Sequence, residues 1–162
     1  MRMLEYGCGG STLAFAPLVT EYCSIEHHPG WYERIRAGIP HNGVIMKLRP
    51  PLWPLANPYD AALPGQFTDY IEAWRECGPP FDAVLIDGRA RVEAALSVAE
   101  GMKPGGWLFF HDYFSRERYW RRQPELERHY ELVESVKDTE QTLAVFRRRV
   151  LRSAMAPQAS LP

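Results

Sequence analysis

The start of the chain carries the feature that most constrains its fold. An apolar stretch leads into Glu5-x-Gly7-x-Gly9 and then into a helical stretch from Leu13 to Val19. Glycine is needed where the backbone takes a positive φ or lies against a ligand with no Cβ in the way. Two glycines so close together, between a strand and a helix, therefore predict a turn that cradles a ligand.

An acidic residue follows at a spacing typical of nucleoside-binding folds. Glu26 lies nineteen residues after Gly7, at the end of an apolar segment that predicts the next strand. A carboxylate there can accept the hydrogen bonds of a ribose diol. A dinucleotide fingerprint would place a third glycine where this chain has Thr12, and Glu5 would repel a pyrophosphate but attract an ammonium group. The turn therefore favours an adenosine cofactor that carries a cation, with an NAD-binding protein as the weaker alternative.

Two later segments extend this pattern. Residues 80–88 form an apolar strand that ends in Asp87, and residues 101–113 form a lysine-proline-glycine-glycine stop followed by a second apolar strand. Together with the glycine turn, these segments resemble the motifs of class I S-adenosylmethionine-dependent methyltransferases. The resemblance extends from Leu4 to Arg147 and implies S-adenosylmethionine as the cofactor.

Within that family, two short strings point to a subgroup. The letters IDG at 86–88 and FHDY at 110–113 are most similar to the macrocin and cephalosporin-hydroxylase-like O-methyltransferases. The DGDHSY signature of that group reads DGRARV here, at 87–92. The resemblance implies O-methylation of a small hydroxylated acceptor, and the departure leaves the acceptor open.

The implied fold is α/β, with a doubly wound, mostly parallel seven-stranded sheet and an antiparallel strand at the end. The alternation of strands and helices agrees with it, and so does a closing antiparallel pair at 130–136 and 142–147. Ser115 is placed to cap a helix over 116–128. Residues 1–147 are expected to form one domain and residues 148–162 a mobile tail. The five prolines between positions 50 and 64 predict an irregular loop, either a lid or a plain connection.

The resemblance also implies where the cofactor binds. The expected positions lie in the glycine turn and at the ends of the second and fourth strands: Glu5, Gly7, Gly9, Ser11, Thr12, Glu26, His27 and Asp87. The alternative for the histidine among them is a polar strand end. Cys8, inside the turn, is expected to be a small residue that fills space.

Three residues are candidates for the chemistry. Asp87 and Asp112 end strands that are neighbours in the family's sheet, about 4.8 Å apart, so their carboxylates can face one another. Such a pair suits Mg²⁺, which would lower the pKa of an acceptor hydroxyl, and the alternative is that each acid caps a helix or turn. Without a metal, His111 is the expected general base, against the alternative of a packed histidine.

Two groups of side chains near these strand ends could meet an acceptor. Aromatic residues at 113, 114, 119 and 120 either line an acceptor pocket or belong to the core. Arginines at 89, 91, 116, 118, 121 and 122 either meet an acidic or phosphorylated acceptor or lie on solvated helix faces. In the second case, Glu117 and Arg121 would form an i,i+4 pair.

Composition narrows the partners. A chain of 162 residues that is 46% hydrophobic and 24% charged can form one globular domain, and a net charge of −1 gives no general attraction to nucleic acid. No apolar run approaches the roughly 20 residues of a membrane span, and no signal peptide is visible. Three cysteines without metal-finger spacing favour a reduced, cytoplasmic interior over a disulfide framework. The expected partner is a small molecule, with neither nucleic acid nor membrane.

Members of the family normally carry helices before the first strand, and these help to close the site. This sequence begins inside that strand, so the resemblance implies either an upstream segment or a partner, a second copy included, that supplies the cover. The alternative to an enzyme is a non-catalytic domain that keeps the fold for binding or as a scaffold.

Overall fold

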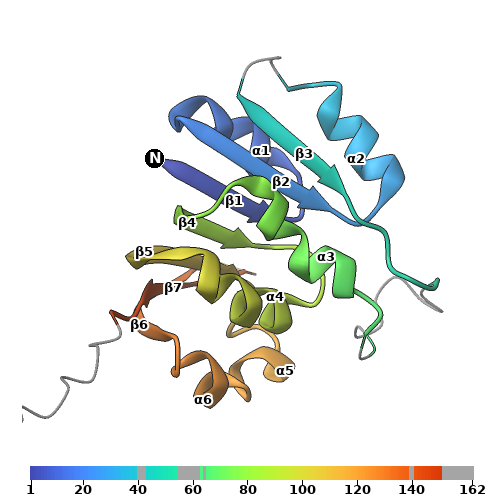
Figure 1. Ribbon diagram of the computed structural model, residues 1–162. Helices are drawn as coiled ribbons and strands as arrows, with labels where there is room; N and C mark the ends of the chain where they lie inside the picture. The colour runs from blue at the N-terminus through green and yellow to red at the C-terminus, as the bar shows by residue number, and fades with distance from the viewer. Residues whose placement is uncertain (40–42, 55–62, 64, 139–140, 151–162) are drawn as a thin grey trace, which may run out of the picture.

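A computed structural model describes residues 1–39, 43–54, 63, 65–138 and 141–150. Its strands are β1 (Arg2–Tyr6), β2 (Glu21–Glu26), β3 (Val44–Leu48), β4 (Phe81–Ile86), β5 (Met102–His111), β6 (Tyr130–Lys137) and β7 (Thr142–Arg148). Within the described residues they form one seven-stranded sheet, in the order β3-β2-β1-β4-β5-β7-β6 (Figure 1). The five strands from β3 to β5 are parallel, and β7 runs antiparallel to both of its neighbours. The predicted sheet is confirmed.

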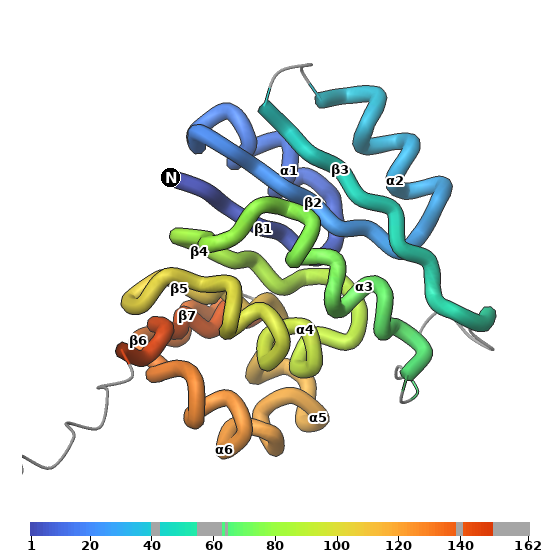
Figure 2. The backbone as a smooth tube through the Cα atoms, in the orientation of Figure 1, coloured from blue at the N-terminus to red at the C-terminus, as the bar shows by residue number. Residues whose placement is uncertain are grey.

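Helices cover both faces of this sheet. They are α1 (Gly10–Phe15), α2 (Pro29–Arg36), α3 (Thr68–Glu72), α4 (Arg91–Val98), α5 (Glu117–Trp120) and α6 (Gln123–Leu126), with 3-10 turns η1 (Ala16–Leu18), η2 (Ala73–Cys77) and η3 (Ala99–Gly101). Figure 2 shows α3 and α4 side by side in front of the sheet, with α1 behind it. Because the five strands are parallel, their carboxyl ends lie at one edge of the sheet, where such folds bind their ligands.

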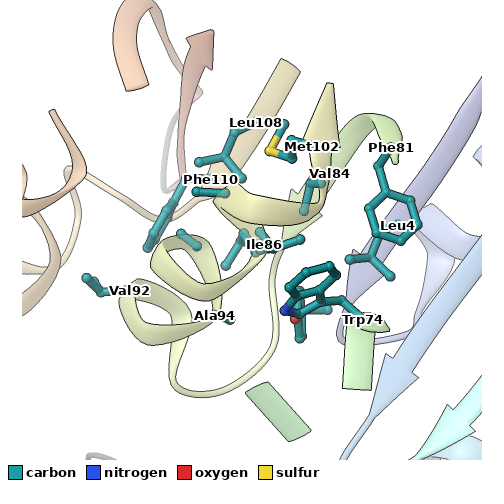
Figure 3. Packing of buried hydrophobic residues seen from close by; sticks show 14 of the residues in the cluster. Leu4, Trp74, Phe81, Val84, Ile86, Val92, Ala94, Met102, Leu108 and Phe110 are labelled. Atoms are coloured by element: carbon teal, nitrogen blue, oxygen red, sulfur yellow. The ribbon is translucent and has the colours of Figure 1, made fainter. Parts of the chain in front are cut away.

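The main core lies between the sheet and the layer of α3, η2 and α4 (Figure 3). Leu4 and Tyr6 alternate with Met3 along β1, so they face this layer while Met3 faces the other side. The packing is close enough to require glycine at Gly101, where an added Cβ would come within 2.3 Å of the Trp74 ring. The packing of this core fixes the positions of β1 and β4, whose carboxyl ends belong to the edge at which such folds bind ligands.

The opposite face is covered less completely. A smaller core cluster there gathers around Met3, Tyr22 and Leu85. Next to it, an apolar cavity of about 380 Å³ lies over β1, β4 and β5, with Trp107 and Leu143 in its lining. The expectation that an upstream segment or a partner supplies a cover stays a prediction.

Two local predictions are wrong. The helix expected over 116–128 is divided into α5 and α6, because Pro124 enters the first turn of α6 and cannot continue the ladder of α5. Ser115 does not cap α5; its Oγ and backbone N–H both contact Thr142 Oγ1, at 3.0 and 3.2 Å. The conformation of Ser115 is therefore determined by a residue that is distant in the sequence, Thr142.

The expected tail also begins too early. Arg148 belongs to β7, and the Arg149 backbone N–H donates to His129 O at 2.9 Å. Residues 151–162 lie outside the described residues, as does much of the proline-rich segment, at 55–62 and 64.

The cysteines overturn another expectation. Cys23 of β2 and Cys77 of η2 form a disulfide across 54 positions, and Cys8 is a buried free thiol. The inference of a reduced interior relied on unpaired cysteines, so it loses its support. In the part of the chain that the structure describes, no helix combines the length and apolar character needed to cross a membrane.

Candidate functional site

A cavity of about 860 Å³ opens at the carboxyl ends of the parallel strands. It is lined by the glycine turn, the end of β2 with the start of α2, the end of β4, and the segment after β5. The lining residues are Gly7, Cys8, Gly9, Gly10, Ser11, Phe15, Glu26, His27, His28, Trp31, Leu85, Asp87, Gly88, Arg89, Arg91, His111, Arg116, Arg118, Tyr119 and Leu143. The structure thus brings together most of the residues that the sequence singled out.

The glycine turn has the backbone geometry that its sequence predicted. Gly7 has a φ of 91° and donates its N–H to Ile25 O at 2.8 Å. A Cβ at Gly7 would lie 2.8 Å from the backbone of Gly88, so β1 and β4 could not approach as they do. A Cβ at Gly10 would meet nothing within 4 Å and would project into the open space that Gly10 lines. The turn is therefore a cradle that side chains would fill.

Glu5 lies beneath this turn and does not line the cavity. Its carboxylate is fully buried and accepts hydrogen bonds from Ser11 Oγ, Thr12 Oγ1 and Ser24 Oγ. Burial raises its pKa, against the opposing effect of the hydroxyl donors. Thr12 is also fully buried, and its Oγ1 accepts the Gly9 N–H at 2.9 Å. These residues brace the turn. Glu5 lies outside the cavity lining, and its contact with a ligand ammonium stays a prediction.

Glu26 lines the cavity at the end of β2. Its Oε1 accepts the N–H groups of His27 and His28 at 2.8 and 2.7 Å, and its Oε2 accepts the N–H of Cys8 at 2.9 Å. Burial alone would raise the pKa of Glu26, but hydrogen bonds from His27, Cys8 and His28 bring it below its usual value. A carboxylate oxygen has two acceptor sites, so the Glu26 carboxylate, which lines the cavity, can accept further hydrogen bonds.

Sequence reasoning missed Trp31. Its indole N–H donates to Cys8 O, which ties α2 to the glycine turn, and its ring lines the cavity near Glu26. His27 also lines the cavity, with Nδ1 2.9 Å from Glu26 Oε1. The available signal was a tryptophan five residues after Glu26, in the helix that begins at Pro29.

Asp87 and Asp112 do come together, but through an arginine. Arg91 Nη2 lies 3.1 Å from Asp87 Oδ1, and Arg91 Nη1 lies 3.8 Å from Asp112 Oδ2. The same guanidinium donates to Gly88 O at 2.9 Å and to His111 O at 2.6 Å. It thereby joins the ends of β4 and β5. Asp112 has a φ of 60°, uncommon for a residue other than glycine, so this end of β5 is held in a strained conformation.

His111 stands between two side chains at the same edge. Its Nδ1 lies 2.9 Å from Asp87 Oδ1, at an angle too oblique for a hydrogen bond, and its Nε2 lies 3.0 Å from Gln141 Oε1. The side chain is 25% exposed and lines the cavity. The imidazole is therefore beside a carboxylate and open to a ligand.

The donor set does not fit the expected divalent cation. Among the described residues, no group of three or more His, Cys, Asp or Glu side chains is arranged to hold a metal ion. Asp87 already faces Arg91 and His111, and Asp112 pairs with Arg116 at 3.0 Å. Guanidinium groups occupy the positions around these carboxylates that a cation would need, so the prediction of Mg²⁺ is not supported.

The other candidates divide between cavity, core and surface. Tyr113 is fully buried in the main core, whereas Tyr119 lines the cavity. Phe114 and Trp120 are exposed and lie outside the cavity lining. Arginines 89, 91, 116 and 118 line the cavity; Arg121 pairs with Glu117, as predicted, and Arg122 with Glu93 and Glu125.

Comparison with known proteins places this geometry in a family. No protein-family model and no curated protein matches the sequence. Among solved structures, the chain is similar to a methyltransferase-like protein from Silicibacter pomeroyi, with 30% identity over 91% of this chain and 77% of that one and a TM-score of 0.64.

Two more distant structures share the fold. One is the N-methyltransferase NodS from Bradyrhizobium japonicum in complex with S-adenosyl-L-homocysteine, with 18% identity, coverage of 91% and 78%, and a TM-score of 0.53. The other is an S-adenosylmethionine-dependent methyltransferase from Mesorhizobium loti, with 14% identity, coverage of 91% and 90%, and a TM-score of 0.57. The 30% identity to the Silicibacter pomeroyi protein over most of both chains places this chain in the family of methyltransferase-like proteins, and its fold is that of the class I methyltransferases.

Proposed function

We propose that this protein transfers the methyl group of S-adenosylmethionine to a hydroxyl oxygen of a small acceptor, without a metal ion. The observation that carries the proposal is the position of His111, which shares one cavity with the glycine turn and lies beside Asp87. The resemblance of IDG at 86–88 and FHDY at 110–113 to the macrocin-like O-methyltransferases supports oxygen as the methylated atom.

The cofactor residues fit this assignment. The open cradle at Gly9 and Gly10 gives room for the methionine part, and the remaining acceptor site on Glu26 Oε2 suits a ribose hydroxyl. When bound, S-adenosylmethionine supplies an electrophilic methyl group on its sulfonium. Direct displacement then needs mainly correct placement of the acceptor and removal of its proton.

His111 is the group that would take this proton. With the imidazole proton on Nδ1, toward Asp87, Nε2 has a free lone pair, and an acceptor hydroxyl that replaces Gln141 beside Nε2 would donate its proton to that atom. The carboxylate of Asp87, next to Nδ1, stabilises the imidazolium that forms. Asp112 contributes through Arg91 and Arg116, so we assign it a positioning role.

Glu26→Ala should weaken binding of S-adenosylhomocysteine by roughly 1.5–3 kcal/mol, the range for losing hydrogen bonds to a charged group. Isothermal titration calorimetry measures this change directly. Glu26→Gln is the second variant, because it keeps an acceptor for the surrounding N–H groups. The matched control is Glu21→Ala, at the exposed start of the same strand, which should bind like the wild type. Absence of binding to the wild type at millimolar ligand would exclude the cofactor assignment.

Replacement of His111 should lower the rate of methyl transfer far more than it lowers the affinity for the cofactor. Loss of a general base costs about 10²–10⁴-fold in rate, so His111→Gln should lower kcat by at least a hundredfold. The assay uses S-adenosylmethionine with a ¹³C-labelled methyl group and a panel of small hydroxylated and aminated acceptors, and carbon NMR separates O-methyl from N-methyl products. His129→Gln, before β6, is the control and should leave the rate unchanged.

The same assay tests the absence of a metal. Activity should persist in excess EDTA, because Asp87 and Asp112 are occupied by arginine and histidine partners. An EDTA-sensitive rate, or transfer only to nitrogen, contradicts the proposal. Cofactor binding without transfer to any acceptor would instead favour a non-catalytic binding domain.

A further inference from the structure

We propose that the acceptor carries an anionic group, a carboxylate or a phosphate, and that arginines at the mouth of the cavity bind it. The inference rests on the proposed methyl transfer and names the substrate class of the same site. It follows from the distribution of charge around the cavity and from the contacts of the arginines within it.

The cavity lining carries an excess of positive charge, although the chain as a whole does not. The chain as a whole has a net charge of −1. Four arginines line the cavity, against the two carboxylates of Glu26 and Asp87. Asp112, which contacts Arg116 from outside the lining, still leaves the arginines in excess. A bound sulfonium would add to this excess, and a cleft with charge of one sign concentrates ligands of the opposite sign.

The arginines are close to one another. Burial lowers the pKa of Arg89, and nearby guanidiniums lower it further. These belong to Arg118, Arg91 and Arg116. Like charges brought together in this way are unfavourable in an empty cavity, and an anion between them would relieve the repulsion.

The cluster has a fixed base and an open rim. Arg91 is fully engaged with Asp87, Asp112 and two backbone carbonyls, so its place is set by the fold. Arg118 is exposed, and no ion pair joins it to a carboxylate among the described residues. We therefore expect Arg118 to make the direct contact with the anion.

Tyr119 holds this rim in shape. The Arg118 Cζ atom lies 5.1 Å from the centroid of the Tyr119 ring, and the Arg91 Cζ atom lies 5.6 Å from it. Contact with an aromatic face orients a guanidinium without using its N–H donors. Arg118 Nη2 donates one hydrogen bond to Tyr119 Oη at 3.4 Å, and its remaining N–H groups can bind a carboxylate or phosphate in a bidentate manner.

The surrounding arginines provide a control. Arg121 lies three residues from Arg118 but pairs with Glu117 on the exposed side of α5 and is absent from the lining described for the cavity. A uniformly solvated helix face would leave the two arginines equivalent. An anion site within the cavity predicts that the affinity for the anion depends on Arg118 and not on Arg121.

The test is a titration of inorganic phosphate, and separately of acetate, into the full-length protein saturated with S-adenosylhomocysteine. Ionic strength is held constant with chloride, and the arginine side-chain N–H resonances report binding. We expect saturable binding to the wild type, at least tenfold weaker binding to Arg118→Gln, an intermediate affinity for Arg118→Lys, and wild-type affinity for Arg121→Gln. Tighter binding of phosphate would indicate a phosphorylated acceptor, and tighter binding of acetate a carboxylated one.

Three results would overturn the inference: neither anion binds the wild type in preference to chloride, Arg118→Gln binds like the wild type, or Arg121→Gln loses as much affinity as Arg118→Gln. The calorimetric titration of S-adenosylhomocysteine keeps the two proposals separate. If the cofactor does not bind but phosphate or acetate still binds at Arg118, the proposed function fails and the anion site remains. If the cofactor binds and neither anion does, only this inference fails.

Discussion

Reduction of the protein should lower its free energy of unfolding by about 4 kcal/mol. Cys23 and Cys77 close a loop across 54 positions, and the loss of chain entropy in the unfolded state gives a value of this size. Urea unfolding with and without dithiothreitol measures the difference. Both sulfur atoms are buried between β2 and η2, so the reductant is added to unfolded protein before refolding.

Cys8→Ala supplies the matched control for this prediction. Cys8 is buried but carries a free thiol, so its variant should show the same gap between oxidised and reduced protein. The double variant Cys23→Ala/Cys77→Ala should have the stability of reduced protein and no response to dithiothreitol. Thiol titration in denaturant without reductant should count one thiol per chain. A count of three would contradict the disulfide.

Arg91→Met should destabilise the protein by about 3 kcal/mol. Breaking a buried ion pair costs about 3–5 kcal/mol because a charge is left uncompensated, and the partial exposure of Asp87 puts the expected value at the low end. The variant also leaves the carbonyls of Gly88 and His111 without their donor. Arg91→Lys should recover part of the loss, since it keeps the charge but not the planar group.

The control for Arg91 is Arg122→Met. Arg122 pairs with Glu93 and Glu125, but its side chain and both partners are about a third or more exposed. Exposed pairs contribute about 0–1 kcal/mol, so this variant should unfold close to the wild type in urea. Equal losses from the two variants would show that the junction of β4 and β5 has no special dependence on Arg91.

The fold could be predicted from the sequence because its signals are local. Glycine and proline mark the turns, and apolar runs such as 81–86 are long enough for a strand buried on both faces. The prediction of one helix over 116–128 relied on Ser115 as its cap and did not treat Pro124 as a break, although this proline is visible in the sequence. Ser115 was misassigned because its partner, Thr142, comes from a strand 27 positions later.

The site was predicted less completely, because its contacts join residues that are distant in the sequence. Residue types at strand ends identified Asp87 and Asp112, but only the fold shows that Arg91 comes between them. The spacing of Asp87 and Arg91, one helical turn apart, was the available signal. Glu5 is buried and lies outside the cavity lining, and no pattern in the sequence indicates that burial. The pairing of Cys23 with Cys77 likewise depends on how β2 and η2 pack.

The position of β7 in the sheet has a consequence for the order in which the site forms. β7 inserts between β5 and β6, and its Thr142 binds the backbone of Asp112, Phe114 and Ser115. β5 ends at His111 and β7 begins at Thr142, so β5 is synthesised before the strand that pairs with it. The glycine turn and its partners in β2 and β4 also come earlier in the chain than β7. Folding of the segment after β5 therefore depends on contacts with a strand whose first residue, Thr142, comes 27 positions after Ser115.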